Sequence, residues 1–310
     1  MIAKQLKRHR TTIEREIDRN VIDGQPYRAE TAQRLADARK PKKRRKLDED
    51  KELRTYVCAE LKRGRNPKVI AGRLKQCHDL IPEVVQGKTI SHESIYQWIY
   101  TGEGRFGGWY TYLPRKHRTR RKKRCRRKRG TKTAFFERIS IEERPGEVET
   151  RRAPGHWETD SIQYTKQREG LSVQTERMFR LCKISRIMNR TAEETRRVLE
   201  ARLGDLPQWI RKTITMDNGP EHALHHELRD PLNLQTYHCD PYASWQRGST
   251  EHMNGLIRRF LPRKTMLATV SDDELQAIED HLNNLPRAIL NYLSPQEAFE
   301  RYQSGGAFGT

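Results

Sequence analysis

The chain has 310 residues and carries 62 Lys and Arg against 41 Asp and Glu, which gives a formal net charge of +21. A chain of this length commonly divides into two or three domains, and a positive charge of this size points to a polyanionic partner. The sequence has no run of the roughly 20 apolar residues that a membrane-spanning helix needs, and residues 1–30 lack the apolar segment of a secretory signal. We therefore expect a cytoplasmic protein.

The five cysteines are scattered along the chain and include no C-x-x-C pair, the spacing typical of zinc sites and thioredoxin-like redox sites. We interpret them as reduced thiols in a cytosolic setting. They are Cys58, Cys77, Cys125, Cys182 and Cys239.

Residues 1–20 show the apolar spacing of two short helices joined by a basic turn at 7–10. Thr11 and Glu14 have the spacing of a capping box, which predicts that the second helix begins there. In a helix-turn-helix unit the second helix reads the major groove, so we expect DNA contacts from its outer surface. The candidates are Arg10, Thr11, Thr12, Arg15 and Arg19.

An ordinary amphipathic helical hairpin would show the same short apolar repeat, and the overall charge is what favours DNA. A helix-turn-helix unit also normally has a further helix packed in front. The pattern therefore leaves open a start upstream of residue 1.

A second group of helices is predicted after the basic run at 40–46, over 53–61, 67–76 and 91–100. Ser91 supplies the N-cap of the last of these helices. Its apolar residues recur at i, i+3 and i+4, so one stripe packs inward while the other side faces solvent. We interpret this group as a second DNA-binding module, with contacts from the outward-facing side chains His92 and Gln97.

Residues 114–133 hold thirteen Lys or Arg and no acidic residue. Such a run does not form a packed core, and a solvated tail or a localisation signal would have the same composition. Its position between two structured regions favours a linker that binds DNA phosphates without reading base sequence.

Acidic residues and strand-like apolar runs return from about residue 150. The segment 156–163 is predicted to be a strand on which His156, Glu158 and Asp160 share one face, because side chains alternate along a strand. We expect Asp160 to be functional and the other two to support it. A second strand is predicted over 178–184.

The segment 213–223 is the most informative one. A short β-branched strand delivers Asp217, and Asn218 with Gly219 then turns the chain toward a helix that Pro220 begins. Asp217 is thus predicted at a strand end, where active sites of α/β sheets commonly lie.

A further strand is predicted to end at Asp240, followed by a loop and a helix. Helical spacing places Glu251, Asn254 and Arg258 on one face of that helix. Trp157 and Trp245 flank the acidic segments, and we expect both to pack in the interior rather than to stack on DNA bases.

Three carboxylates brought together from two strands and a helix offer the oxygen ligands that Mg²⁺ prefers, and Mn²⁺ would be held in the same way. Two such ions can activate a water or a 3′ hydroxyl and stabilise the leaving oxygen at a DNA phosphate. Taken singly, each acid would be an ordinary surface residue. The combination with a basic front half predicts that Asp160, Asp217 and Glu251 are both the catalytic residues and the metal ligands.

These segments resemble the IS-thirty family of bacterial insertion-sequence transposases, which belongs to the DDE group. The resemblance rests on APGHWETDSI around Asp160, TITMDNGPEHA around Asp217 and DPYASWQRGSTEHMNGLIRRFLPRKT around Glu251. The family places 33 residues between its second and third acids, and 33 residues separate Asp217 from Glu251 here. His252 departs from the Asn-Glu-Asn core typical of members, and His222 stands where members have an aromatic residue.

The resemblance implies an α/β ribonuclease H-like catalytic domain with a mixed five-stranded sheet, preceded by an all-α helix-turn-helix region. We predict a first helix-turn-helix with a basic arm over 1–46, a second helical domain over 47–113, a basic linker over 114–149 and the catalytic (integrase core) domain over 150–310. Asn254, Arg258 and Lys264 are further candidate DNA contacts near the acids.

The function that follows is a DNA transposase that binds the inverted-repeat ends of an insertion sequence and carries out Mg²⁺-dependent strand cleavage and strand transfer into target DNA. Its partner would be double-stranded DNA near the bacterial nucleoid, and pairing of two ends implies a homodimer or a larger synaptic complex. Two alternatives remain open, a catalytically inactive DNA-binding repressor derived from a transposase, and a ribonuclease H-like nuclease or resolvase.

Overall fold

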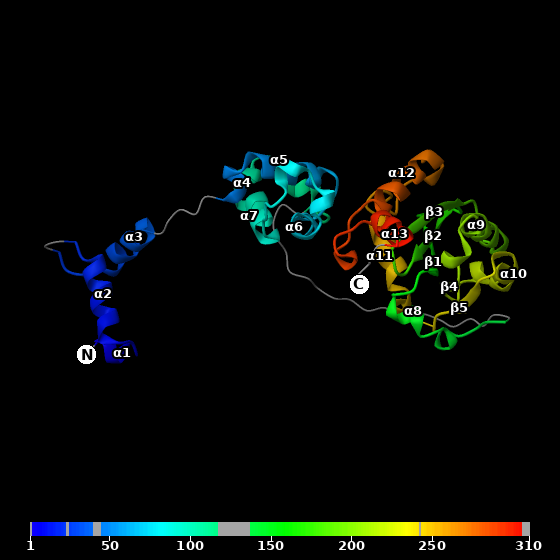
Figure 1. The fold of residues 1–310 in the computed structure, drawn as a ribbon, viewed down its shortest axis with the longest axis horizontal. Helices are drawn as coiled ribbons and strands as arrows, with labels where there is room; N and C mark the ends of the chain where they lie inside the picture. Colours follow the sequence, from blue (N-terminus) through cyan, green and yellow to red (C-terminus); the bar gives the residue numbers. More distant parts are fainter. Residues whose placement is uncertain (1, 23–24, 40–44, 117–136, 242, 306–310) are drawn as a thin grey trace. The chain divides into compact units, whose positions relative to one another are not determined.

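The structure is a computed structural model that describes residues 2–22, 25–39, 45–116, 137–241 and 243–305. By their contacts these residues form two units, Met1–Glu49 and Asp50–Thr310 (Figure 1). The finer four-part division predicted above stays a prediction. Cys58, Cys77, Cys182 and Cys239 are free thiols, whereas Cys125 and the centre of the predicted basic linker, residues 117–136, lie outside the described residues.

The first unit consists of short helices, α1 (Ile2–Gln5), α2 (Arg10–Asn20), α3 (Ala29–Arg39) and α4 (Lys46–Glu49). The predicted start of the second helix at a Thr11 capping box is wrong. The N-cap is His9, whose side chain accepts the backbone N–H of Thr11, while Glu14 forms an ion pair with Arg10 at 2.7 Å. Arg39 donates to the Arg19 carbonyl oxygen at 2.7 Å and so ties α3 to α2.

The second unit opens with three helices that form where the sequence predicted them, α5 (Lys51–Lys62), α6 (Pro67–Gln76) and α7 (His92–Thr101). Each has a polar N-cap that accepts a backbone N–H of its first turn. Ser91 caps α7, as expected, by accepting the N–H of Ser94 at 3.0 Å. The apolar stripes of the three helices pack together around Leu61, Ile70 and Ile95.

A mixed five-stranded sheet follows, in the order β3-β2-β1-β4-β5. β1 pairs antiparallel with β2 and β2 with β3, whereas β4 runs parallel to both β1 and β5. The strands are β1 (His156–Gln163), β2 (Gly170–Glu176), β3 (Cys182–Ile187), β4 (Thr213–Met216) and β5 (Gln235–His238). The sheet confirms the predicted fold class, a ribonuclease H-like α/β domain after an all-α region.

The predicted strand over 178–184 is wrong, because that apolar run contains a tight turn. Arg180 has a left-handed backbone with φ 65°, and the buried Glu176 carboxylate accepts the N–H of Phe179 at 2.6 Å. β2 ends before this turn and β3 begins after it, so the chain reverses where continuous apolar character had suggested a strand.

Helices cover both faces of the sheet (Figure 1). One apolar cluster packs α9 against the sheet around Trp157 and Met216, and the other packs α11 and α12 against it around Ile162 and Val173. The helices of this part are α8 (Glu147–Thr150), α9 (Ala192–Gly204), α10 (Arg229–Leu232), α11 (Gly248–Ile257), α12 (Asp272–Asn283) and α13 (Pro295–Gln303). Single 3-10 turns lie at His78–Leu80, Glu83–Val85, Glu103–Arg105, Trp109–Tyr112, Ile141–Glu143, Gln208–Ile210, Pro220–His222, His225–Leu228, Ser244–Arg247, Leu267–Thr269 and Ala288–Leu290.

The segment that precedes the sheet packs along its β5 edge. Ser140 forms an isolated parallel bridge to His238, and the Arg144 guanidinium donates to the Thr215 hydroxyl at 2.8 Å. Across the described ranges, none of the helices has the length and apolar character needed to cross a membrane.

Candidate active site

The acidic face of β1 points toward α11, as strand alternation predicted. Glu158 is fully buried, and its Oε2 accepts the backbone N–H groups of Ser249 and Thr250 at 3.0 Å each. Its other carboxylate oxygen pairs with the buried Arg177 guanidinium. Glu158 is therefore a supporting residue, as expected, because it binds the first turn of α11 instead of facing solvent.

Asp160 lies within β1 and Asp217 directly follows β4, and Arg247 lies between the two carboxylates. The Arg247 guanidinium is 3.0 Å from Asp160 Oδ1 and 3.1 Å from Asp217 Oδ2. It also donates to the Thr159 carbonyl oxygen at 3.0 Å. One buried cation thus joins the two predicted catalytic aspartates.

This arrangement keeps Asp217 ionised. Burial alone would raise its pKa, but the neighbouring His222 and Arg247 and the N–H of Gly219 outweigh that effect and lower the pKa below its usual value. Burial alone would likewise lower the pKa of Arg247, yet the charges of Asp160 and Asp217 raise it. The Asp217 carboxylate is therefore negative at neutral pH.

The remaining contacts of Asp217 fix the turn after β4. Its Oδ1 accepts the backbone N–H of Gly219 at 3.0 Å, and His222 Nε2 lies 3.4 Å from the same oxygen. His238 Nδ1 lies 3.0 Å from the Asp217 carbonyl oxygen, which can only accept, so that nitrogen carries a proton. Burial lowers the pKa of His238 to about 4, so its ring is neutral near pH 7.

Glu251 is exposed on the first turn of α11. One turn further along, Asn254 donates from Nδ2 to Asp160 Oδ2 at 2.9 Å, so this face of α11 is turned toward the aspartates. In the described parts of the chain, no hydrogen bond or ion pair joins Glu251 to Asp160 or Asp217. The structure thus brings two of the three predicted acids into direct contact with one cation and places the third on the adjacent helical face.

The residues present fit a divalent cation. Besides the carboxylates, two amide oxygens beside the aspartates, Asn218 Oδ1 and Asn254 Oδ1, are buried without a hydrogen-bond partner among the described residues. Unpartnered buried acceptors are uncommon, and carboxylate and amide oxygens are the ligands that hard cations take.

Known proteins similar to this chain point to one family. The chain is 34% identical over 306 residues to the transposase for insertion sequence element IS4351 of Bacteroides fragilis, covering 97% of this chain and 89% of that protein. It is also 34% identical over 308 residues to the transposase InsI for insertion sequence element IS30A of Escherichia coli (strain K12), covering 97% of this chain and 78% of that protein. The chain belongs to the IS30, or IS-thirty, family of insertion-sequence transposases.

Among solved structures, the catalytic core domain of BIV integrase is similar with a TM-score of 0.38 and 16% identity, covering 49% of this chain and 97% of that chain. No family model matches the chain.

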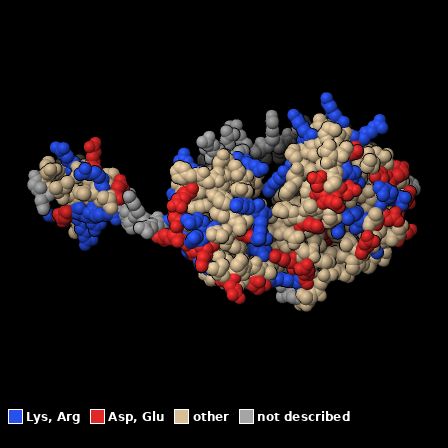
Figure 2. All heavy atoms as spheres, turned by 90° about the horizontal axis from the view of Figure 1, so that it is seen from above, with Lys and Arg blue, Asp and Glu red and all other residues tan. Residues whose placement is uncertain are grey.

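Most of the predicted DNA contacts of this transposase lie at the surface. The five predicted contacts on α2 are exposed, and Figure 2 shows Lys and Arg gathered together on the N-terminal unit. His92 and Gln97 are exposed on α7, and Lys264 is exposed after α11, whereas Asn254 and Arg258 are half-buried. Their role in binding DNA stays a prediction.

A polar groove of about 550 Å³ runs beside the Asp160 end of β1. Asn254 and Arg258 from α11 line it together with Tyr164 and Arg263. The Arg258 guanidinium lies 4.4 Å from the centre of the Tyr164 ring and is held over it by cation–π attraction. This groove gives a substrate a cationic wall next to the aspartates of the transposase.

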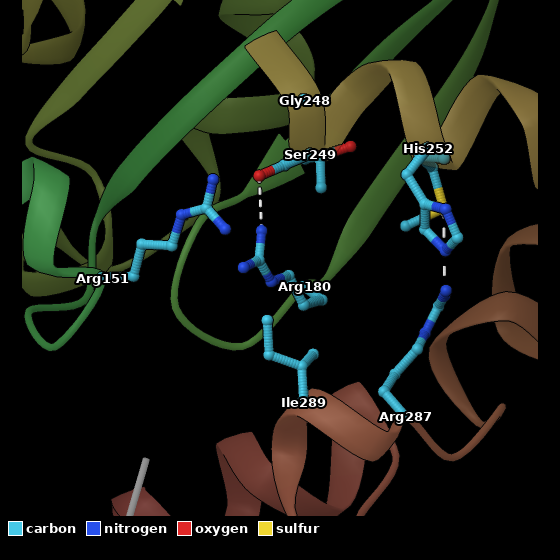
Figure 3. Close-up of a pocket in the computed structure, with 9 residues that line it drawn as sticks. Arg151, Arg180, Gly248, Ser249, His252, Arg287 and Ile289 are labelled. Atoms are coloured by element: carbon cyan, nitrogen blue, oxygen red, sulfur yellow. Dashed lines mark hydrogen bonds between the residues drawn. The ribbon is translucent and has the colours of Figure 1, made fainter. Parts of the chain in front are cut away.

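A second hollow, which we call the arginine pocket, lies on another side of α11 and has a volume of about 320 Å³. Figure 3 shows Arg180 pointing to Ser249 and Arg287 pointing toward His252, with Arg151 at the edge. Burial lowers the pKa of Arg180 and of Arg287 to about 10 each, so both stay charged near pH 7. Within the ranges that the structure describes, neither guanidinium forms an ion pair with a carboxylate, so the pocket suits an anion.

Of the two tryptophans that we expected to pack, one does. Trp157 is 1% exposed, and its Nε1 donates to the Ile210 carbonyl oxygen at 2.7 Å. The expectation for Trp245 is wrong, because that side chain is 75% exposed. It belongs to the short 3-10 turn Ser244–Arg247, which places Arg247 under the aspartates and leaves Trp245 outside the core.

Sequence reasoning missed Arg247, Arg180 and Arg287. Arg247 lies in the 3-10 turn before α11, and only the fold brings it to Asp160 and Asp217. The two pocket arginines are separated by more than a hundred residues, and only the fold brings them together.

Proposed function

We propose that this member of the family is an active DNA transposase that cleaves the ends of an insertion sequence with Mg²⁺ or Mn²⁺ and transfers them into target DNA. Asp160, Asp217 and Glu251 are the proposed catalytic carboxylates and metal ligands. The observation that carries the proposal is the shared contact of Asp160 and Asp217 with one buried guanidinium, beside the helix that presents Glu251. Two carboxylates that share one cation between them are suited to holding a divalent metal.

When bound, divalent metal would supply Lewis-acid stabilisation of the DNA phosphate and of the attacking oxygen. The protein residues prepare the site for that chemistry. Asn254 orients Asp160 through its 2.9 Å hydrogen bond, and Glu158 fixes the helical turn that carries Glu251. If a metal were held by Asp160 and Asp217, the Arg247 guanidinium that now contacts them would be available to bind a DNA phosphate.

The proposed reaction has two steps at phosphorus. A water first displaces the 3′ oxygen at the element's end, which leaves a free 3′ hydroxyl and a 5′ phosphate. That hydroxyl then attacks a phosphodiester of the target, forming one new P–O bond as another breaks. Both steps need the same three carboxylates and a DNA strand in the polar groove beside Asn254 and Arg258.

The decisive experiment measures Mg²⁺-dependent cleavage of DNA that carries the gene's own flanking ends. Asp217→Asn and Glu251→Gln are expected to abolish cleavage while leaving end binding largely intact. Asp273→Asn and Glu193→Gln, which change exposed acids at the starts of α12 and α9, serve as matched controls. Cleavage retained in Asp217→Asn would overturn the assignment.

A catalytically inactive DNA-binding repressor is a second candidate, favoured by one observation. His252, next to Glu251, departs from the family pattern. End binding without metal-dependent cleavage by the wild type would select this candidate. Cleavage of arbitrary structured DNA without preference for inverted-repeat ends would instead select a nuclease or resolvase.

We also propose that exposed basic residues of the first unit bind double-stranded end DNA near the bacterial nucleoid, with Arg10, Arg15 and Arg19 contacting DNA from α2. Thr11 and Thr12 lie on the same exposed surface. The α7 side chains His92 and Gln97 would add a second contact region. Pairing of two ends requires two copies of the chain, so a homodimer or larger assembly is expected on end DNA.

A further inference from the structure

A second set of possible metal ligands lies at Asp217. Asp217, Glu221 and His222 each offer one ligand atom, and these atoms all lie within 4.8 Å of one another. The turn after β4 and the 3-10 helix Pro220–His222 bring them together over only six residues. Asp217 reaches this cluster through Oδ1, whereas its Oδ2 contacts Arg247.

The burial and the missing hydrogen bonds of the His222 side chain are a second, independent indication of a bound cation. Its side chain is 3% exposed, and neither ring nitrogen has a hydrogen-bond partner among the described residues. Nε2 faces Asp217 Oδ1 at 3.4 Å, within reach of a shared cation. Buried polar atoms usually have a hydrogen-bond partner. A metal ion held together with the two nearby carboxylates would supply the partner that the imidazole nitrogen lacks.

Gly219 keeps the space between the two carboxylates open. A Cβ atom at this position would lie 2.5 Å from Glu221 Oε2 and 3.0 Å from Asp217 Oδ1. Ser161 donates to Glu221 Oε1 at 2.9 Å and so turns the other oxygen, Oε2, toward the cluster. The three ligand atoms are thus held around a gap that only glycine permits.

We propose that Asp217, Glu221 and His222 form a divalent-cation site that prefers Mn²⁺ to Mg²⁺. Imidazole nitrogen is a good ligand for transition metals, whereas Mg²⁺ favours an all-oxygen set with near-ideal octahedral geometry. The inference rests on the proposed function, because Asp217 is shared with the catalytic set, and it deepens that function by assigning a metal preference to this chain.

The test is electron paramagnetic resonance of Mn²⁺ added to the full-length chain without DNA. Electron spin echo modulation is expected to show coupling to a directly bound ¹⁴N nucleus, and competition is expected to show Mn²⁺ binding at least about tenfold tighter than Mg²⁺. His222→Phe should remove the nitrogen coupling and weaken Mn²⁺ binding by about tenfold or more, with Mg²⁺ affinity little changed. His78→Phe, at an exposed histidine of another region, is the matched control.

If the His222→Phe variant fails to fold, the measurements on wild-type protein alone still test the proposed site. A Mn²⁺ spectrum without ¹⁴N coupling, or equal affinity for the two ions, would overturn the inference even if DNA cleavage with Mg²⁺ succeeds. Nitrogen coupling that is present in wild type and lost in His222→Phe supports the inference, even if no DNA is cleaved. The two proposals therefore fail separately.

Discussion

Glu158 Oε2 accepts the backbone N–H of Ser249 at 3.0 Å, so a fully buried side chain of β1 holds the first turn of α11. The strand that carries Asp160 thereby also fixes the helix that presents Glu251. Arg177 neutralises Glu158 from the other side. The buried Glu158–Arg177 pair therefore helps to set the distance between Asp160 on β1 and Glu251 on α11, which do not contact each other directly.

Glu158→Gln is expected to lower the free energy of unfolding by up to about 3–5 kcal/mol, because it removes the buried partner of the Arg177 charge and leaves only the exposed Glu149 carboxylate at 3.4 Å. Urea denaturation measures this loss. Adding Arg177→Met to the variant should restore a large part of the stability, since the poorly paired buried charge is then gone. A double variant no more stable than Glu158→Gln would show that the pair is not the source of the effect.

Arg247 predicts a link between metal and stability. Arg247→Met leaves the Asp160 and Asp217 carboxylates close together without their shared cation, so the metal-free protein should lose about 3–5 kcal/mol. Saturating Mg²⁺ should then raise the Tm of the variant more than that of the wild type, because metal replaces the missing charge and binds the folded state only.

Thermal unfolding with and without Mg²⁺ checks this expectation. Arg259→Met, at an exposed arginine just after α11, is the control and should show the wild-type response. Equal Tm shifts in Arg247→Met and wild type would mean that the metal does not use the carboxylates that Arg247 contacts.

We predict that the arginine pocket binds one phosphate group of DNA. Arg180→Gln is expected to weaken DNA binding about equally for different sequences and to reduce the slope of log K against log salt by about one. Fluorescence anisotropy over a range of salt concentrations measures both. Arg190→Gln, an exposed arginine before α9, removes the same charge elsewhere. An unchanged slope in Arg180→Gln would exclude a DNA phosphate from the pocket.

Local patterns in the sequence were enough to predict β1 and α6 at their observed bounds, and the N-cap of α7. These elements carry their own signals, strand alternation and capping residues. At these elements the local sequence pattern determines the secondary structure, so it can be predicted without the tertiary fold.

The strand β2 was not predicted: Leu171 and Val173 alternate with Ser172 and Gln174, but the polar side chains are buried as fully as the apolar ones. Its burial on both faces depends on the helices that cover the sheet. Arg247 was missed for a related reason. An arginine in a loop is usually solvated, and only the parallel pairing of β1 with β4 creates the buried negative charge that draws it inward.

His156 predicts how stability changes in acid. Burial lowers its pKa from 6.5 to about 4, despite the nearby Glu147. A depressed pKa in the folded state means that the contribution of His156 is present above pH 6.5 and is lost as the pH falls toward 4. The loss amounts to at most about 3 kcal/mol. Glu176 acts in the opposite direction, because burial raises its pKa to about 7 and folding then favours its protonated form as the pH falls.

The two effects overlap, so the informative quantity is the difference in unfolding free energy between wild type and His156→Asn. Asn keeps a polar atom near the Thr213 hydroxyl, which His156 Nδ1 contacts at 2.9 Å, and it does not titrate. We expect the advantage of wild type over the variant to shrink steadily between pH 6.5 and 4 in urea denaturation, while His78→Asn shows no such trend. A difference that stays constant over this range would mean that His156 takes up its proton equally in the folded and unfolded chains, and that its burial does not oppose the charged form.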